Sequence, residues 1–430
     1  MALTGRAVLA ALAGVLVVLA VRAGLVLLAV NGLLLAAIAA DLALAAPVRP
    51  LRLARSGDTR VLLGENGSVT LAVQNPGPRP LRAQIRDAWQ PSAGAHPHHH
   101  RLHVPPGGRA SLTTTLTPVR RGDKQAAGVT VRSVGPLGLA ARQAGLTAPW
   151  TVRVLPPFRS RRHLPAKLAR LRLLDGQHRA LLRGQGSEFD SLREYVIGDD
   201  VRSIDWRATA RRRDVMVRTW RPERDRRILI VLDTGRTSAG RVGGVPRLDA
   251  AMDAALLLTA LASRAGDRVD LIAFDRRVRA RVVGTPRPAV LPAVADAMAG
   301  LEPELVETDA AALASAALTT AGHRCLIVLL TDLNPAAVTD GLLPRLPLLA
   351  ARNEVLVAAV ADPALAELAA GRGDAARVYE AAAAEQALAA RQRVSALLRR
   401  CGARVTDAPP DQLPAALADA YLALKAAGRL

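Results

Sequence analysis

Cysteine, lysine and aromatic residues are all scarce in this chain of 430 residues. The two cysteines, Cys325 and Cys401, form no CxxC pair and offer no disulfide framework, which favours a reducing compartment. The aromatic residues are only four Trp, three Tyr and three Phe, and no basic segment is rich in them. Because single-strand binders stack bases on aromatic rings, nucleic acid is not expected as a partner.

Recognised enzyme motifs are missing as well. No Gly-Lys-Ser/Thr occurs, so the chain has no P-loop and is not expected to hydrolyse ATP. Phe189 stands where a dinucleotide loop begun by Gly184 and Gly186 would need its third glycine. A G-x-S-x-G elbow and an HExxH helix are also absent. The chain is therefore predicted not to be an enzyme, and the alternative of an uncharacterised hydrolase has no motif behind it.

Arginine supplies most of the charge. Lys and Arg together number 58 against 37 Asp and Glu, a net charge of +21, yet only Lys124, Lys167 and Lys425 are lysines. A positive field of this size favours anionic partners such as phospholipid headgroups or an acidic protein face. Since aromatic residues are few, membrane or protein contact is predicted in preference to nucleic acid.

Two apolar runs open the chain. Residues 7–21 and 23–40 are nearly continuous apolar stretches separated by Arg22. A membrane span needs about 20 residues, so residues 1–48 are predicted to form a transmembrane hairpin of two short helices. A single helix over both runs would be too long for a bilayer. The lipid bilayer is therefore one expected partner.

Basic residues flank these runs and predict their orientation. Arg6 precedes the first run, and three arginines follow the second: Arg49, Arg52 and Arg55. Because basic flanks stay on the cytoplasmic side, the chain is expected to be a multi-pass membrane protein with cytoplasmic soluble domains. A signal peptide over residues 1–21 is the alternative, although the second run follows at once and would stop transfer.

Residues 49–157 change to short β-rich pieces divided by Pro/Gly turns. The clearest pieces are residues 59–63, 68–73, 110–116 and 128–132. Regularly spaced strands with turn chemistry between them predict an all-β sandwich of immunoglobulin-like type.

A histidine cluster lies within this β-rich region. Its members are His96, His98, His99, His100 and His103. They could bind a transition metal, but Pro97 and the Pro/Gly surroundings favour an exposed loop, on which adjacent histidines have no imposed geometry.

Residues 158–227 are predicted to form a basic linker that ends in a dense motif. Leu164, Leu168, Leu171 and Leu174 recur at helical spacing among arginines. Such a basic amphipathic segment either lies on the inner leaflet or covers the neighbouring domain, and domain packing is preferred because the stripe is short.

The motif that follows carries a family resemblance. Its residues are Gly186, Glu188, Phe189, Arg193, Tyr195, Gly198, Asp199, Asp200, Arg202, Asp205, Trp206 and Arg211. This set resembles the signature of the domain-of-unknown-function family fifty-eight. The resemblance implies a membrane-anchored protein with a von Willebrand factor A-like domain that works with a MoxR-type AAA+ ATPase. Because the acids of the motif alternate with arginines, ion pairs are predicted rather than a general acid and base. Trp206 is predicted to be buried, so that its truncation would destabilise the domain.

Residues 228–430 alternate strand and helix. Strands are predicted at residues 228–232, 269–274, 326–330, 355–360 and 404–405, with an antiparallel edge strand at 277–282. Helices are predicted near residues 247–264, 288–300, 309–320, 336–351, 376–400 and 411–427. Near-continuous apolar strands between helices predict a doubly wound α/β domain, as a von Willebrand factor A-like fold would be.

Four carboxylates each follow an apolar strand and should meet at the carboxyl edge of this sheet: Asp233, Asp275, Asp332 and Asp362. Similarity to von Willebrand A-like domains implies a Mg²⁺ site from Asp233, Thr237, Thr308 and Asp332. Gly235 has no hydroxyl where that site needs one, so Mg²⁺ is disfavoured as a cofactor.

Arg236 lies beside these carboxylates and could take the place of the cation by pairing with Asp233 or Asp332. The edge is then predicted to be a metal-free partner-binding face that includes Arg236, Asp275 and Asp362. The predicted function is a cytoplasm-facing, membrane-anchored adaptor for the ATPase in a chaperone-like or complex-maturation role. An envelope-facing structural or adhesion protein is the alternative.

Overall fold

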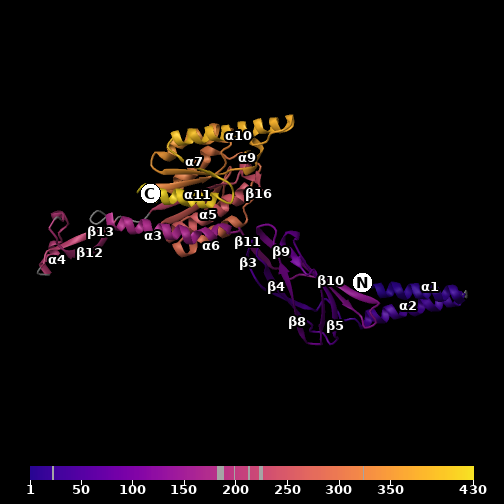
Figure 1. Cartoon of the computed structure of the whole chain (residues 1–430). Coiled ribbons are helices and arrows are strands. Elements are labelled where there is room, and N and C mark those ends of the chain that lie inside the picture. Colours follow the sequence, from indigo (N-terminus) through magenta and orange to yellow (C-terminus); the bar gives the residue numbers. More distant parts are fainter. Residues whose placement is uncertain (22–23, 182–187, 198, 212–213, 222–225, 323) are drawn as a thin grey trace. The chain divides into compact units, whose positions relative to one another are not determined.

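The computed structural model describes residues 1–21, 24–181, 188–197, 199–211, 214–221, 226–322 and 324–430. Its internal contacts divide the chain into two compact units, Met1–Pro157 and Phe158–Leu430. The helices and strands of both units are labelled in Figure 1.

Two apolar helices begin the first unit, α1 (Gly5–Val21) and α2 (Gly24–Leu44). They pack closely, since a Cβ on Gly14 would lie 2.6 Å from Cγ1 of Val30. Within the described residues, α2 alone is long and apolar enough to cross a membrane, because α1 has only 17 residues. The prediction of two apolar helices is therefore confirmed, while only one of them meets the length of a full span.

Two β-sheets form the rest of the first unit. The smaller has the order β2-β4-β8-β6, and the larger runs β1-β10-β9-β11-β3 with β5 paired to β9 and β7 to β5. Their bounds are β1 (Ala2–Leu3), β2 (Arg52–Gly57), β3 (Arg60–Leu62), β4 (Gly67–Gln74), β5 (Leu81–Trp89), β6 (Ala95–His96), β7 (His99–Val104), β8 (Arg109–Leu116), β9 (Gly122–Val134), β10 (Ala140–Leu146) and β11 (Thr151–Leu155). Leu71 of the smaller sheet and Ile85 and Val131 of the larger are at most 1% exposed and share one core, because strand alternation turns them inward.

A buried ion pair lies in the interior of this β unit. Asp87 is fully buried and accepts hydrogen bonds from Arg55 Nη2 at 2.5 Å, Thr114 Oγ1 at 2.7 Å and Trp89 Nε1 at 3.0 Å. Burial alone would raise the pKa of Asp87, but these hydrogen bonds hold it below its ordinary value. The expectation that Arg55 flanks a membrane span is wrong, because its side chain is 1% exposed inside the unit.

The histidines are largely exposed, as predicted, but within the cluster only His98 lies in a loop. His96 belongs to β6, and His99, His100 and His103 belong to β7. Successive side chains of a strand point to opposite faces, so the rings of His99 and His100 diverge, whereas the ring centroids of His96 and His98 lie 6.4 Å apart. His100 approaches Thr114, and its pKa is lowered by burial. Among the described residues, no three His, Cys, Asp or Glu side chains come together as a metal site.

The second unit is built on an open, mostly parallel sheet with the order β18-β17-β14-β19-β20-β21. The strands are β14 (Arg227–Asp233), β17 (Arg268–Phe274), β18 (Val278–Val282), β19 (Cys325–Leu330), β20 (Glu354–Val360) and β21 (Arg404–Ala408). Only the pairing of β18 with β17 is antiparallel in the described sheet, as the edge-strand prediction required. Cys325 is buried at the start of β19, and burial raises the pKa of its thiol to about 12.

Helices cover both faces of this sheet (Figure 1). One face packs against α5 (Arg247–Arg264), α6 (Arg287–Ala299) and α11 (Leu413–Ala426). The other packs against α7 (Ala310–Ala321), α8 (Leu346–Ala350) and α10 (Ala375–Arg400). Successive residues of β14 enter different cores: Ile230 lies in the core on one face and Val231 in the core on the other, as expected for a sheet buried on both sides.

Two helical segments of this unit differ in detail from the prediction, although the helix near 336–351 lies where it was expected. The expected helix near 336–351 is a π-helical turn at Ala337–Leu342, a 3₁₀ turn at Leu343–Arg345 and the short α8, because Pro344 and Pro347 cannot donate helical hydrogen bonds. A short helix, α9 (Pro363–Ala369), was not predicted.

The basic linker contains α3 (Leu164–Leu181), a hairpin of β12 (Glu188–Glu194) and β13 (Met216–Arg221), and α4 (Trp206–Arg211). Leu171 is 3% exposed, and Leu164, Leu168 and Leu174 pack against the core of α5 and α11. Lys167 pairs with Asp419 of α11 at 2.7 Å. Domain packing, the preferred interpretation of the leucine stripe, is confirmed.

Candidate functional site

The candidate site lies at the carboxyl edge of the sheet, where β14 and β19 end side by side. Asp233, the last residue of β14, is 5% exposed. Its carboxylate accepts hydrogen bonds from Thr308 Oγ1 and Thr331 Oγ1, both at 2.6 Å, and from the Gly235 N–H at 2.9 Å. Thr237 Oγ1 lies 3.5 Å from the same carboxylate. The structure therefore brings Asp233, Thr237 and Thr308 together as predicted, and adds Thr331.

Thr331 was missed by sequence reasoning although a signal was present. It directly follows the apolar run of β19 and precedes Asp332, so it had to fall at the same edge. The sequence prediction considered only carboxylates at the strand ends and therefore did not include the Thr331 hydroxyl.

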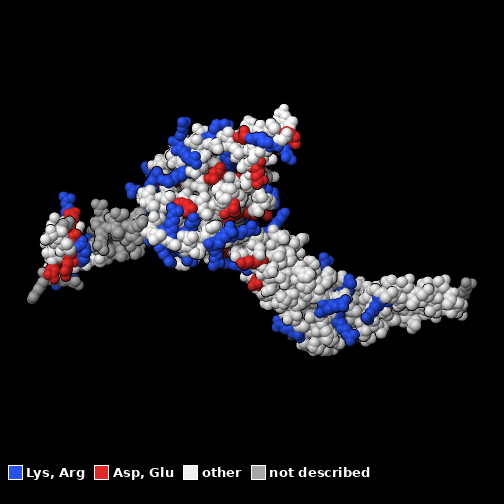
Figure 2. All heavy atoms as spheres, viewed as in Figure 1, with Lys and Arg blue, Asp and Glu red and all other residues white. Residues whose placement is uncertain are grey.

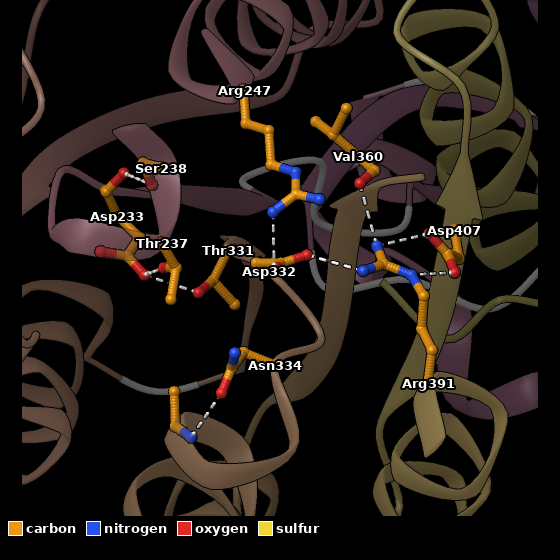
Figure 3. A network of polar contacts seen from close by, with 11 residues as sticks. Asp233, Thr237, Ser238, Arg247, Thr331, Asp332, Asn334, Val360, Arg391 and Asp407 are labelled. Atoms are coloured by element: carbon orange, nitrogen blue, oxygen red, sulfur yellow. Dashed lines mark hydrogen bonds and ion pairs between the residues drawn. The ribbon is translucent and has the colours of Figure 1, made fainter. Parts of the chain in front are cut away.

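Asp332 is held by two arginines, as Figure 3 shows. Its Oδ2 accepts from Nη1 of Arg247 at 3.0 Å, and its Oδ1 accepts from Nη1 of Arg391 at 2.7 Å. Arg391 also donates to both oxygens of Asp407 and to the Val360 carbonyl. Burial alone would lower the pKa of Arg391, but Asp407 and Asp332 raise it, so this guanidinium is a permanent positive charge.

Arg236 does not replace a cation, and that expectation is wrong. Its Nη2 pairs with Glu307 Oε1 at 2.7 Å, and both side chains are more than half exposed. Arg236 begins a 3₁₀ turn, Arg236–Ala239, whose backbone places its side chain toward solvent. The positive charge beside Asp332 comes instead from α5 and α10.

Asp275 and Asp362 have local structural partners. Asp275 is 2% exposed and accepts from the N–H groups of Arg276 and Arg277, from Arg279 and from Thr234. Burial alone would raise the pKa of Asp275, but these donors lower it. Asp362 caps α9 by accepting from the N–H of Ala364 at 3.0 Å. Neither carboxylate lines the cavity beside Asp233.

A cavity of about 330 Å³ opens beside Asp233. Its apolar floor includes Val231, Leu313, Leu329 and Leu342. Polar groups line its mouth: Arg236, Thr237, Glu307, Thr308, Thr331, Asp332 and Asp340. The π-helical turn Ala337–Leu342 forms one wall, and such turns are frequent at functional sites. An apolar floor with a polar mouth suits an anchor side chain better than a solvated ion.

The oxygen atoms near Asp233 bear on cation binding. Both oxygens of Asp332 already accept from guanidinium groups. Gly235 offers no side-chain oxygen to a metal, and a Cβ there would lie 2.1 Å from Thr308 Oγ1. Of the two predicted carboxylate ligands, only Asp233 is not paired with a guanidinium, and it accepts hydrogen bonds from Thr308, Thr331 and the Gly235 N–H, whereas Mg²⁺ sites in proteins are built on carboxylates in near-octahedral geometry.

The acids of the signature motif form turns and helix caps. Asp199 pairs with Arg193 at 2.5 Å and accepts from the Val196 N–H. The hydrogen bond with Arg193 lowers the pKa of Asp199. Asp200 caps the 3₁₀ turn Val201–Ser203 through the Arg202 N–H.

Asp205 caps α4 and pairs with Arg218 at 2.7 Å, which lowers the pKa of Asp205. The N–H of Tyr195 donates to the Val215 carbonyl between the two strands, and Arg211 is exposed at the end of α4. Gly186 and Gly198 lie outside the described residues, as do the side chains of Glu188 and Phe189.

Trp206 was expected to be buried, and that expectation is wrong. Its side chain is 69% exposed, and Ile197 and Val201 nearby in the sequence are 97% and 65% exposed. Because the acids of the motif hold the backbone and these apolar side chains do not pack within the hairpin, the signature displays an apolar surface.

The described residues thus define a class: a chain with an apolar N-terminal helix, a β-sheet unit, and an open α/β unit whose carboxyl edge holds an ion-paired aspartate. Residues 191–399 match the family described as "Protein of unknown function DUF58". The sequence resemblance is confirmed.

Relatives in mycobacteria carry no assigned function. The uncharacterised proteins Rv1480 of Mycobacterium tuberculosis and Mb1516 of Mycobacterium bovis are each 31% identical over 201 residues, which is 46% of this chain. The chain covers 62% of the length of these relatives.

Solved structures with some likeness include the CARDB domain of the PF1109 protein from Pyrococcus furiosus, 17% identical over 24% of this chain and 87% of that domain, with a TM-score of 0.19. A β-glucosidase from Listeria innocua is 15% identical over 24% of this chain and 16% of the enzyme, with a TM-score of 0.16. Neither likeness bears on function.

Proposed function

We propose that this protein is a membrane-anchored adaptor whose α/β unit binds a protein partner, a MoxR-type AAA+ ATPase, in a chaperone-like or complex-maturation role. The observation that carries the proposal is the cavity of about 330 Å³ at the carboxyl edge, with its apolar floor and charged mouth. An apolar floor beneath charged groups suits an apolar side chain of a partner protein, and no P-loop accompanies this edge.

A von Willebrand factor A-like, doubly wound fold is part of the proposal. Helices on both faces of the sheet and the antiparallel β18 at its edge support it. An immunoglobulin-like sandwich is proposed for residues 49–157, supported by the core that the two β-sheets share.

The membrane arrangement completes the proposal. We infer that α1 and α2 enter the bilayer together, since their leucines are exposed over most of their length. The 17 residues of α1 fall at the lower limit for a span of roughly 17–25 residues. Arg6 and Arg49 flank the pair and favour a cytoplasmic position for both ends. A reporter fused after Leu430 should then be active only in its cytoplasmic form, and activity of an export-dependent reporter there would favour the envelope-facing adhesion protein.

We also infer that the carboxyl edge works without a divalent cation. Arg247 and Arg391 supply positive charge at Asp332, which removes the need for a metal there. Gly235 leaves no room for the hydroxyl that a Mg²⁺ site would require.

Capture of the purified MoxR-type ATPase by the detergent-solubilised full chain tests the proposal. Ala337→Trp should block the cavity and reduce capture, because Ala337 is exposed and lines the cavity. Thr339→Trp is the matched control, since Thr339 is exposed on the same turn but does not line the cavity.

The possible results separate two docking faces. Loss of capture with Ala337→Trp alone supports the carboxyl edge. Loss with Trp206→Ala and not with Ala337→Trp would move the docking face to the signature hairpin, whose apolar residues are exposed. No capture by the wild-type chain would reject this ATPase as the partner.

A further inference from the structure

Arginines gather at the end of the β unit from which the two apolar helices leave. Figure 2 shows basic residues where the largely white helical pair meets the β unit. The arginines at this end, here called the arginine collar, are Arg6, Arg49, Arg52, Arg79, Arg82, Arg109 and Arg142.

Strand register and hydrogen bonds place the collar at one end. Arg52 and Arg109 both lie opposite Gln74, at the end of their sheet. Arg142 Nε donates to the Leu42 carbonyl of α2 at 2.9 Å, and Arg79 donates to the Ala43 carbonyl.

The remaining members lie at the same end. Arg82 is the second residue of β5, beyond the turn that carries Arg79. Arg49 follows the end of α2 by five residues, and Arg6 lies beside Gly138, where a Cβ would be 3.0 Å from its Nη1. The collar therefore surrounds the helix ends.

Acidic side chains do not neutralise the collar. Among the described residues, none of its seven arginines has a carboxylate partner. The one acid at this end, Asp41, is fully buried. Asp58 and Asp123 lie at the opposite ends of the strands, where Asp58 bonds Ser68 and Asp123 pairs with Arg153. Positive charge is thus concentrated at the helix ends.

Asp41 fixes the position of the collar relative to the helices. Its carboxylate accepts hydrogen bonds from the N–H groups of Leu137 and Leu139, both at 2.7 Å, and of Ala140 at 2.8 Å. The start of α1 is tied to the same turn, because β1 pairs with β10 and the Thr4 N–H donates to the Leu139 carbonyl. Both helices are clamped to the β unit at the level of the collar.

We propose that the arginine collar binds the anionic headgroups of phospholipids where the helical pair enters the bilayer. Leu25, Leu28 and Leu33 of α2 are 72–82% exposed, so they require an apolar surrounding, and the clamp then sets the collar at headgroup depth. A guanidinium matches phosphate with two hydrogen bonds, and basic residues at a membrane surface are attracted to anionic lipid. The proposal rests on membrane insertion of α2 within the proposed function.

Lipid selectivity of the full chain tests the collar. The chain is reconstituted in phosphatidylcholine bilayers that contain trace spin-labelled phosphatidylglycerol or phosphatidylcholine, and the immobilised fraction of each lipid gives their relative association. The wild-type chain should hold phosphatidylglycerol several-fold more strongly at low salt, with the preference reduced at high salt. Neutralising one surface arginine removes up to roughly fivefold in association.

Matched double variants localise the effect. Arg49→Gln with Arg109→Gln removes two collar charges and should lower the preference at least roughly threefold. Arg86→Gln with Arg120→Gln removes the same charge from exposed arginines away from the collar and should leave the preference nearly unchanged. Arg86 lies further along β5, opposite His99, and Arg120 follows the far end of β8.

Three results would overturn the proposal. They are an equal preference in both double variants, no preference in the wild-type chain, and release of the wild-type chain from the vesicles by alkaline carbonate. The last result would also remove the membrane anchor from the proposed function, whereas the first two leave the anchor intact and reject the collar alone.

Discussion

Arg391 offers a sharp test of the carboxyl edge, because one guanidinium there joins the ends of β19, β20 and β21. It bonds Asp332 of the loop after β19, the Val360 carbonyl of β20 and Asp407 of β21. Arg391→Gln removes the charge and keeps part of the side-chain length. Asp332, 8% exposed, then keeps Arg247 alone, and Asp407, 27% exposed, loses the partner that holds both of its oxygens.

The expected cost follows from this burial. Removing one partner of a buried ion pair costs about 3–5 kcal/mol, because the other charge stays buried without compensation. The remaining Arg247 and the partial exposure of Asp407 place this site at the lower end, about 3 kcal/mol. For a unit of this size, that loss lowers the melting midpoint by about 6–10 °C.

Calorimetry of the full chain in detergent measures the change. Arg393→Gln is the control, since Arg393 lies on the same helix and is exposed. Adding Asp407→Asn to Arg391→Gln should recover part of the loss, because Asp407 is the carboxylate that loses the guanidinium from both of its oxygens. Equal midpoints for Arg391→Gln and Arg393→Gln, or no recovery in the double variant, would refute the view that Arg391 compensates charge at this edge.

Four further predictions follow from single contacts. Asp87 has a lowered pKa in the folded chain, so the stability it contributes is present above its ordinary pKa of 3.8 and is lost as pH falls further. Asp87→Asn should therefore reduce the fall of the melting midpoint at acid pH. An unchanged fall of the midpoint at acid pH would contradict this. Gly235→Ser should lower the melting midpoint, at an overpacking cost of about 1–3 kcal/mol, because the new Cβ would meet Thr308. Mg²⁺ should not raise the midpoint of this variant. A large rise of the midpoint with Mg²⁺ in the wild-type or the variant chain, abolished by Asp233→Ala, would show a metal site. Arg236→Glu should leave the midpoint nearly unchanged, since its pair with Glu307 is exposed, yet weaken ATPase capture; equal capture would remove Arg236 from the docking face. Trp206→Ala should also keep the wild-type midpoint, and a loss of several degrees would show that this exposed ring is covered in solution.

Local patterns determined much of the α/β unit in advance. The apolar strands at β14, β17, β19 and β20 and the helix α5 lie within a residue or two of their predicted bounds. These elements are encoded by apolar periodicity within windows of a few residues, which a sequence displays directly. The common edge at which parallel strands end placed Asp233 at the candidate site, and the resemblance to von Willebrand A-like domains added Thr237 and Thr308.

Prediction failed where polar residues interrupt an element or where a pattern depends on packing. The strand β5 was not predicted, since the inward position of Asp87 breaks its apolar alternation. Trp206 was expected to be buried because aromatic residues commonly are, whereas the acids around it shape the backbone and leave the ring outside.

Sequence alone thus determined most elements of the α/β unit, the resemblance to the matched family and the edge at which the candidate site lies. Only the tertiary structure decided which charges meet there. Arg247 precedes Asp332 by 85 residues and Arg391 follows it by 59, while Arg236, only three residues from Asp233, turns to Glu307 instead. Ion pairing depends on which side chains the packed helices bring within about 3 Å of each other. The number of residues between two side chains in the sequence does not predict that distance.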